Sequence, residues 1–196
     1  MKKIVLTFGL ISGAIMSGLM TVVMVFAHQT NPSSGMIIGY TIMVLSFLLV
    51  FFGIRSYREN VGNGYIGFGR ALGVGLLIML ISCACYVGTW EVVYHKFMPD
   101  FGEKYLAQSI ERLRVSGKSP QEIESEIQSM RSMMQLYNSN IFFNMAITFL
   151  EPLPVGVLMA LISAAILRKR RREEGGEEQD LQDYRDGVKE TSVNPV

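Results

Sequence analysis

Residues 71–90 read ALGVGLLIMLISCACYVGTW, a run without a single Asp, Glu, Lys or Arg. A helix needs about 20 consecutive, mostly apolar residues to cross a bilayer, so this run by itself predicts a membrane span. Residues 4–27 and 36–54 are equally free of charged side chains, and residues 141–167 carry only one, Glu151. We therefore predict an all-α, polytopic membrane protein in which these four runs are transmembrane helices.

The composition excludes the common soluble classes. Of the 196 residues, 49% are hydrophobic and only 18% are charged, and a soluble chain of this length builds no core that would bury four such runs. A soluble enzyme, a disordered chain and a disulfide scaffold are therefore excluded. The formal net charge of +1 hides opposing blocks of charge and predicts no nucleic-acid partner. Residues 1–167 form the predicted membrane domain, for which the lipid bilayer is the surrounding partner.

The basic residues are unevenly distributed, and their distribution predicts the orientation of the chain. Two lysines precede the first span, residues 55–70 hold three arginines against one acid, and the fourth span is followed by RKRRR. The connection 28–35 carries no charged residue, while residues 91–140 mix bases with acids. Because Lys and Arg concentrate on the cytoplasmic side of membrane proteins, we expect both termini in the cytoplasm and residues 91–140 outside.

Residues 99–140 predict a pair of helices that form a hairpin outside the membrane. Ser119-Pro120-Gln121-Glu122 is a capping box with proline at the first helical position, which marks the start of the second helix. Apolar residues recur at helical spacing along both helices, namely Tyr105, Ile110 and Leu113 in the first and Ile123, Ile127, Met130, Met134 and Tyr137 in the second. These two faces either pack together or rest on the membrane. Met130, Met133 and Met134 either bind another protein or a lipid, or they only fill the core.

Glu151 is the most informative single residue. It lies within Leu150-Glu151-Pro152-Leu153-Pro154, in the interior of the fourth span. A carboxylate in lipid is costly and usually faces a bundle interior or a cavity, and prolines interrupt helical hydrogen bonding and free carbonyl groups. One interpretation is a proton or cation site formed by Glu151, Pro152 and Pro154. The other is a protonated carboxyl group that hydrogen-bonds a neighbouring helix or lies near the outer interface.

Small residues recur every four positions in two spans, at Gly9, Gly13 and Ser17 and again at Gly69 and Gly73. Such residues let helices approach closely in lipid, where packing replaces the hydrophobic driving force. Both sets are candidate helix-packing positions. The contact that they form is either a homodimer interface or packing within one chain.

No other motif predicts chemistry. Residues 62–67 spell G-x-G-x-x-G, but membrane spans flank them instead of the strand and helix of a dinucleotide site, so we interpret them as a turn. Cys83 and Cys85 lie about 200° apart around a helix and cannot form a disulfide with each other there. We find no nucleophile–base pair, phosphate-binding loop or zinc-ligand spacing, and we expect no cofactor, no metal and no enzymatic activity.

Three stretches together resemble a bacterial family of small integral membrane proteins known as a domain of unknown function, DUF4199. They are KKIVLTFGLISGAIM (2–16), GIRSYRENVGNGYIGFGRALGVGLLI (53–78) and FLEPLPVGVLMALISAAILRKR (149–170). The resemblance covers roughly residues 2–170 and implies four helices in a bacterial cytoplasmic (inner) membrane. It implies no activity and gives Glu151 no role. Residues 168–196 become acidic after their basic cluster and lack apolar periodicity, which predicts a disordered cytoplasmic tail.

These features favour a non-enzymatic integral membrane protein that acts through helix or hairpin contacts in the bacterial envelope. Its partner is then a second copy of the chain or another envelope protein. The alternative is a small oligomeric transporter or proton-coupled permease that uses Glu151. An intramembrane enzyme is the weakest option, because the predicted spans offer no second ionisable group to pair with Glu151.

Overall fold

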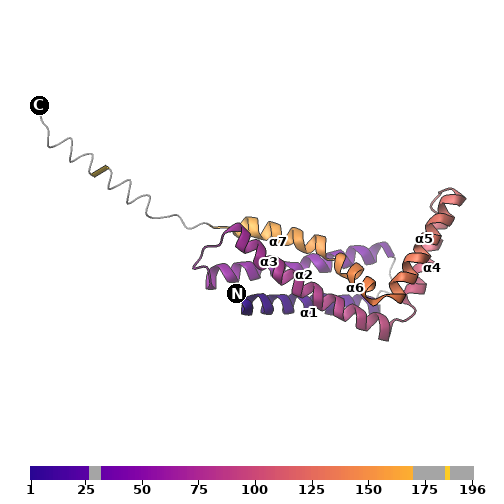
Figure 1. Cartoon of the computed structure of the whole chain (residues 1–196), viewed down its shortest axis with the longest axis horizontal. Coiled ribbons are helices and arrows are strands. Elements are labelled where there is room, and N and C mark those ends of the chain that lie inside the picture. Colours follow the sequence, from indigo (N-terminus) through magenta and orange to yellow (C-terminus); the bar gives the residue numbers. More distant parts are fainter. Residues whose placement is uncertain (27–31, 170–183, 186–196) are drawn as a thin grey trace, which may run out of the picture.

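The computed structural model describes residues 1–26, 32–169 and 184–185, and within them the fold is all-α (Figure 1). Four helical segments are long and apolar enough to cross a membrane: Lys2–Met24, Ile37–Asn60, Phe68–Phe97 and Ile141–Leu167. This confirms the prediction of four helices that are long and apolar enough to span a membrane. In chain order the elements are α1 (Lys2–Phe26), α2 (Pro32–Asn60), α3 (Phe68–Val92), the π-helical turn η2 (Val93–Phe97), α4 (Phe101–Arg114), α5 (Pro120–Ser139), α6 (Ile141–Leu150) and α7 (Leu153–Leu167).

The long helices form a bundle in which α2 and α3 contact each other and both pack against α1 and α7. The centre holds fully buried side chains, among them Phe47, Ile54 and Ile78. The N-terminus and the end of α7 lie at one end of the bundle, and the α4–α5 hairpin lies at the other (Figure 1). Segments 170–183 and 186–196, which contain most of the predicted disordered tail, lie outside the described residues.

Small and hydroxyl-bearing residues bring α1 close to its neighbours. A Cβ atom added at Gly9 would lie 2.8 Å from the Cβ of Ile81, and one added at Gly13 would lie 2.6 Å from the Cβ of Cys85, so α1 and α3 meet at these glycines. Two buried serines also form hydrogen bonds between helices. Ser82 Oγ on α3 donates to the Gly9 carbonyl on α1 (3.1 Å), and Ser12 Oγ on α1 donates to the Ser46 carbonyl on α2 (2.8 Å). Such close packing is the main source of helix association in lipid.

Two helices run further than the apolar pattern predicted. The predicted span 36–54 ends six residues before α2 does, and the polar end of α2 is stabilised by Arg55, whose Nε lies 2.9 Å from Glu59 Oε1. The charged ends of such side chains reach the interface while their stems stay apolar. The predicted span 71–90 likewise stops short of Phe97, where η2 ends.

The turn between α2 and α3 is attached to the end of α7. Asn63 and Gly64 adopt positive φ angles of 49° and 85°, which asparagine and glycine tolerate best. Ile66 and Lys169 then exchange two backbone hydrogen bonds of 3.0 and 2.9 Å, and Arg58 Nη1 donates to the Leu167 carbonyl (3.4 Å). These contacts link the α2–α3 turn to Leu167 and Lys169 at the end of the fourth span.

The predicted hairpin is present as α4 and α5. The capping box is confirmed, since Ser119 Oγ accepts from the backbone N–H of Glu122 and Glu122 Oε2 accepts from the N–H of Ser119 (3.0 Å). All five residues of the predicted α5 stripe are buried or half-buried. On α4 the prediction holds for Ile110 and Leu113 but not for Tyr105, which is 56% exposed and whose ring stacks on Phe101 of its own helix.

Replacing Ser119 by alanine is expected to loosen the start of α5 by about 1 kcal/mol, the usual cost of losing an N-cap side chain. The hydrogen bonds from Ser119 hold the pKa of Glu122 below its ordinary value. A depressed carboxyl pKa stabilises the folded form above the unfolded pKa of about 4.3 and stops doing so as the pH falls through the folded value. Hydrogen exchange at the first turn of α5 measures both effects, and Ser125→Ala, in the helix interior, is the control. Equal exchange in the two variants at neutral pH would contradict the cap.

Candidate functional site

The fourth span is broken at Glu151 and Pro152, between α6 and α7. Pro152 and Pro154 have no N–H to offer the carbonyls of Thr148 and Leu150, so two helical hydrogen bonds are missing there. The break that the prolines predict is thus present. Pro152 is fully buried, whereas Glu151 and Pro154 are exposed on the surface of the bundle. The three candidate residues therefore do not converge on one enclosed site.

Glu151 is joined to α3 by a hydrogen bond, in which Tyr86 Oη donates to Glu151 Oε2 across 3.2 Å. The carboxyl group thus lies at the helix break, on the outside of the bundle, with one neighbouring helix as its partner. This position differs from the bundle interior that is usual for membrane carboxylates.

A chain of hydrogen bonds connects α3 with α5 and α6 at the hairpin end. Trp90 Nε1 donates to Tyr137 Oη (2.7 Å), Tyr137 Oη lies 3.2 Å from Thr148 Oγ1, and Thr148 Oγ1 donates to Asn144 Oδ1 (3.3 Å). In a second link Tyr94 Oη donates to Asn138 Oδ1 of α5. We call Trp90, Tyr94, Tyr137, Asn144 and Thr148 the hairpin-base cluster.

Two carboxylates lie close to this cluster. Burial raises the pKa of Tyr137, and the nearby negative charges of Glu91 and Glu151 raise it further, while its hydrogen bonds to Thr148 and Trp90 act in the opposite direction. The side chain of Glu91 is only 14% exposed, and neither of its carboxylate oxygens has a hydrogen-bond partner among residues 1–26, 32–169 and 184–185.

Glu91 corrects one sequence-based inference. The predicted third span ended at Trp90, so Glu91 lay outside it. The predicted spans then contained no second ionisable group that could pair with Glu151. Because α3 continues through η2, Glu91 belongs to the helix that crosses the membrane. Asn144 and Thr148 were also missed, although they lie seven and three residues before Glu151, a spacing that places all three near one face of a helix. That spacing was the available signal.

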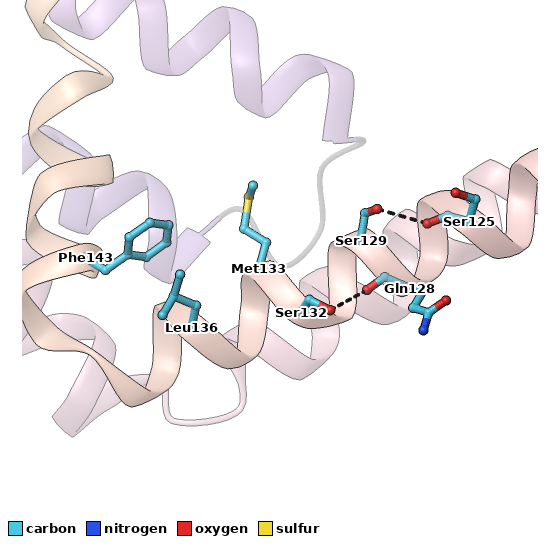
Figure 2. Close-up of a pocket in the computed structure, with 7 residues that line it drawn as sticks. All are labelled: Ser125, Gln128, Ser129, Ser132, Met133, Leu136 and Phe143. Atoms are coloured by element: carbon cyan, nitrogen blue, oxygen red, sulfur yellow. Dashed lines mark hydrogen bonds between the residues drawn. The ribbon is translucent and has the colours of Figure 1, made fainter.

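A shallow, open groove of about 530 Å³ runs along α5 to the start of α6. Figure 2 shows Met133, Leu136 and Phe143 at its apolar end and the serines at its polar end. The hydroxyls of Ser129 and Ser132 donate to carbonyls of their own helix, so that they offer a ligand mainly acceptor lone pairs. The full lining is Ser125, Gln128, Ser129, Ser132, Met133, Leu136 and Phe143.

The small-residue positions fall into two groups. Gly9 and Gly13 pack on α3, and Ser17 is buried, so this set serves packing within one chain. A Cβ atom added at Gly69 or Gly73 would meet nothing within 4 Å. A side chain at either position would therefore meet no other residue of the described chain, and the packing role of this second set stays a prediction.

The fold and the four apolar helices define a multi-pass, α-helical membrane protein. Residues 7–169 match the family described as "Protein of unknown function (DUF4199)". The chain belongs to that family, in agreement with the resemblance of its three quoted stretches. No curated protein and no solved structure matches the chain.

Proposed function

We propose that this protein is a non-enzymatic component of the bacterial cytoplasmic membrane whose α4–α5 hairpin binds another envelope protein. The observation that carries the proposal is the groove along α5, whose apolar end is formed by Met133, Leu136 and Phe143. Met133 is 62% exposed and Leu136 44%. Large exposed apolar patches on the polar side of a protein usually mark contact sites. Methionine side chains suit such a surface because they adapt to different partners.

The proposed orientation places the hairpin outside the cell membrane and both termini in the cytoplasm. Lys2 and Lys3 begin α1, Arg55 and Arg58 lie near the end of α2, Arg70 lies in the first turn of α3, and Lys169 follows α7. The N-terminus and the end of α7 lie at the end of the bundle away from the hairpin (Figure 1). The rule that cytoplasmic loops are rich in Lys and Arg supports this assignment. The hairpin surface then faces extracytoplasmic proteins.

A photocrosslinking amino acid at position 133 is expected to capture a discrete envelope protein in native membranes, because Met133 lines the groove and is 62% exposed. The matched control carries the same crosslinker at Glu124, which is exposed on α5 but does not line the groove. Adducts that form equally from both positions, or from neither, would contradict the proposed contact. Turnover of a substrate by the purified protein alone would contradict its non-enzymatic part.

A second candidate function is proton-coupled transport by an oligomer that uses Glu151. The exposed carboxyl group at the helix break, bonded to Tyr86, favours it. Four spans are few for a pathway, so a dimer would supply the remaining helices.

Replacing Glu151 by glutamine is expected, on this second hypothesis, to abolish proton-linked flux in reconstituted vesicles, because the amide does not titrate. Glu111→Gln on the exposed face of α4 is the control and keeps the flux. Flux that is unchanged in Glu151→Gln, or absent from the natural protein, discards transport.

A further inference from the structure

The carboxyl group of Glu91 is buried and has no hydrogen-bond partner among the residues that the structure describes. Its two oxygens are shielded from solvent and receive no hydrogen bond from the described part of the chain. Buried polar groups in proteins almost always have partners, and each exception requires an explanation. A partner for Glu91 is therefore expected among the groups that surround the α3–η2 junction.

The nearest cationic group is His95, one turn further along. Its Nδ1 lies 3.9 Å from Glu91 Oε2, and its side chain is 49% exposed, so bulk protons reach it. Histidine is the side chain whose charge ordinarily changes between about pH 5 and 8. The protonated ring presents a charged N–H donor to the carboxylate, and such charge-assisted bonds are stronger than neutral ones.

This pair is attached to the residues that hold the hairpin. Trp90, which precedes Glu91, donates to Tyr137 of α5. The Tyr94 ring lies 5.3 Å from the His95 ring, and Tyr94 donates to Asn138 of α5. A change in the charge of His95 therefore acts on the helical turn that carries two hydrogen bonds to the hairpin.

The other titratable and charged groups near the pair do not replace His95. Tyr94 of η2 and Tyr137 of α5 carry phenols, which are neutral between about pH 5 and 8. Glu151, at the α6–α7 break, has its own partner in Tyr86 of α3. Lys96 is exposed on η2, and the structure records no contact between it and Glu91.

We propose that Glu91 and His95 form a proton-binding pair that controls how firmly the α4–α5 hairpin is held on α3. At acidic pH the imidazolium Nδ1–H donates to Glu91 Oε2, and the junction is firm. As the pH rises and the ring becomes neutral, Glu91 loses the positive charge that faces it, and the hairpin loosens. The inference concerns the isolated protein, so it stands or falls independently of any partner of the hairpin.

The only tryptophan of the chain, Trp90, reports directly on this junction. Acrylamide quenching of its fluorescence, in the full-length protein in liposomes, is expected to rise in a single step between about pH 5 and 8. Glu91→Gln and His95→Gln are expected to lose the step. His95→Arg, whose charge is permanent, is expected to keep the low quenching of the acidic form at every pH, which a variant that merely misfolds would not do.

Two control variants decide which groups are responsible. His28→Gln removes the only other histidine, and Glu151→Gln removes the other carboxyl group near Tyr137. Both are expected to keep the step. A step that survives in His95→Gln, disappears in either control or is absent from the natural protein would overturn the proposal, as would pH-dependent quenching in His95→Arg.

Discussion

Replacing Gly13 by leucine is expected to force α1 away from α3 and to destabilise the bundle by about 1–3 kcal/mol, the usual cost of overpacking a core. A Cβ atom at this position would lie 2.6 Å from Cys85 Cβ and 3.2 Å from Ser82 Cα. Neither atom is the end of a flexible side chain, so a helix has to move. Since close packing holds helices together in lipid, the lost contact is not replaced by a hydrophobic gain.

Gly18→Leu is the matched control for this experiment. Gly18 lies on the same helix, and a Cβ atom there would meet nothing within 4 Å. Leucine has a better helix propensity than glycine in both variants, so the difference between their melting temperatures in detergent isolates the clash. Equal melting temperatures would show that α1 does not pack on α3 as described.

Replacing Tyr137 by phenylalanine is expected to detach the hairpin from α3. The change removes the oxygen that accepts from Trp90 Nε1 and contacts Thr148 Oγ1. A buried donor without its partner costs about 1–3 kcal/mol, a large fraction of the free energy that holds so small an element. The emission of Trp90 is expected to shift, and hydrogen exchange in α5 is expected to accelerate.

Tyr105→Phe provides the control for the hairpin experiment. Its ring belongs to the same aromatic group but is 56% exposed, and the described residues give its hydroxyl no hydrogen bond. Unchanged Trp90 emission and unchanged hydrogen exchange in Tyr137→Phe would show that the hairpin-base cluster does not hold the hairpin on α3. A comparable shift in Tyr105→Phe would show that the measurement reports a general disturbance of the aromatic residues.

The spans and the start of α5 were predictable from sequence because their causes are local. An uncharged run such as 71–90 prefers hydrocarbon to water wherever it lies in the chain. Ser119 and Glu122 are three residues apart and cap the same helix turn. The break at Pro152 is equally local, because the missing N–H belongs to the residue itself.

The candidate site was not predictable because it depends on contacts distant in sequence. Trp90 meets Tyr137, and Tyr86 meets Glu151, only after α3, α5 and α6 have packed together. A span predicted from the absence of charged residues ends at the first charged residue. The prediction therefore stopped before Glu91, although the helical segment continues to Phe97. Spacing showed that Gly9 and Gly69 lie in stripes, but only the packed bundle shows that Gly9 contacts α3 and that a side chain at Gly69 would meet no other residue of the described chain.

The central claim is that four helices cross the membrane and leave the hairpin outside and the α2–α3 turn inside. Labelling of intact cells with a membrane-impermeant maleimide tests it most directly, with one variant carrying Ser125→Cys on α5 and another Val61→Cys in the turn. Both positions are exposed. The account predicts that the Ser125→Cys variant is labelled in intact cells and the Val61→Cys variant only after permeabilisation. The reverse pattern, or labelling of both variants in intact cells, would contradict it.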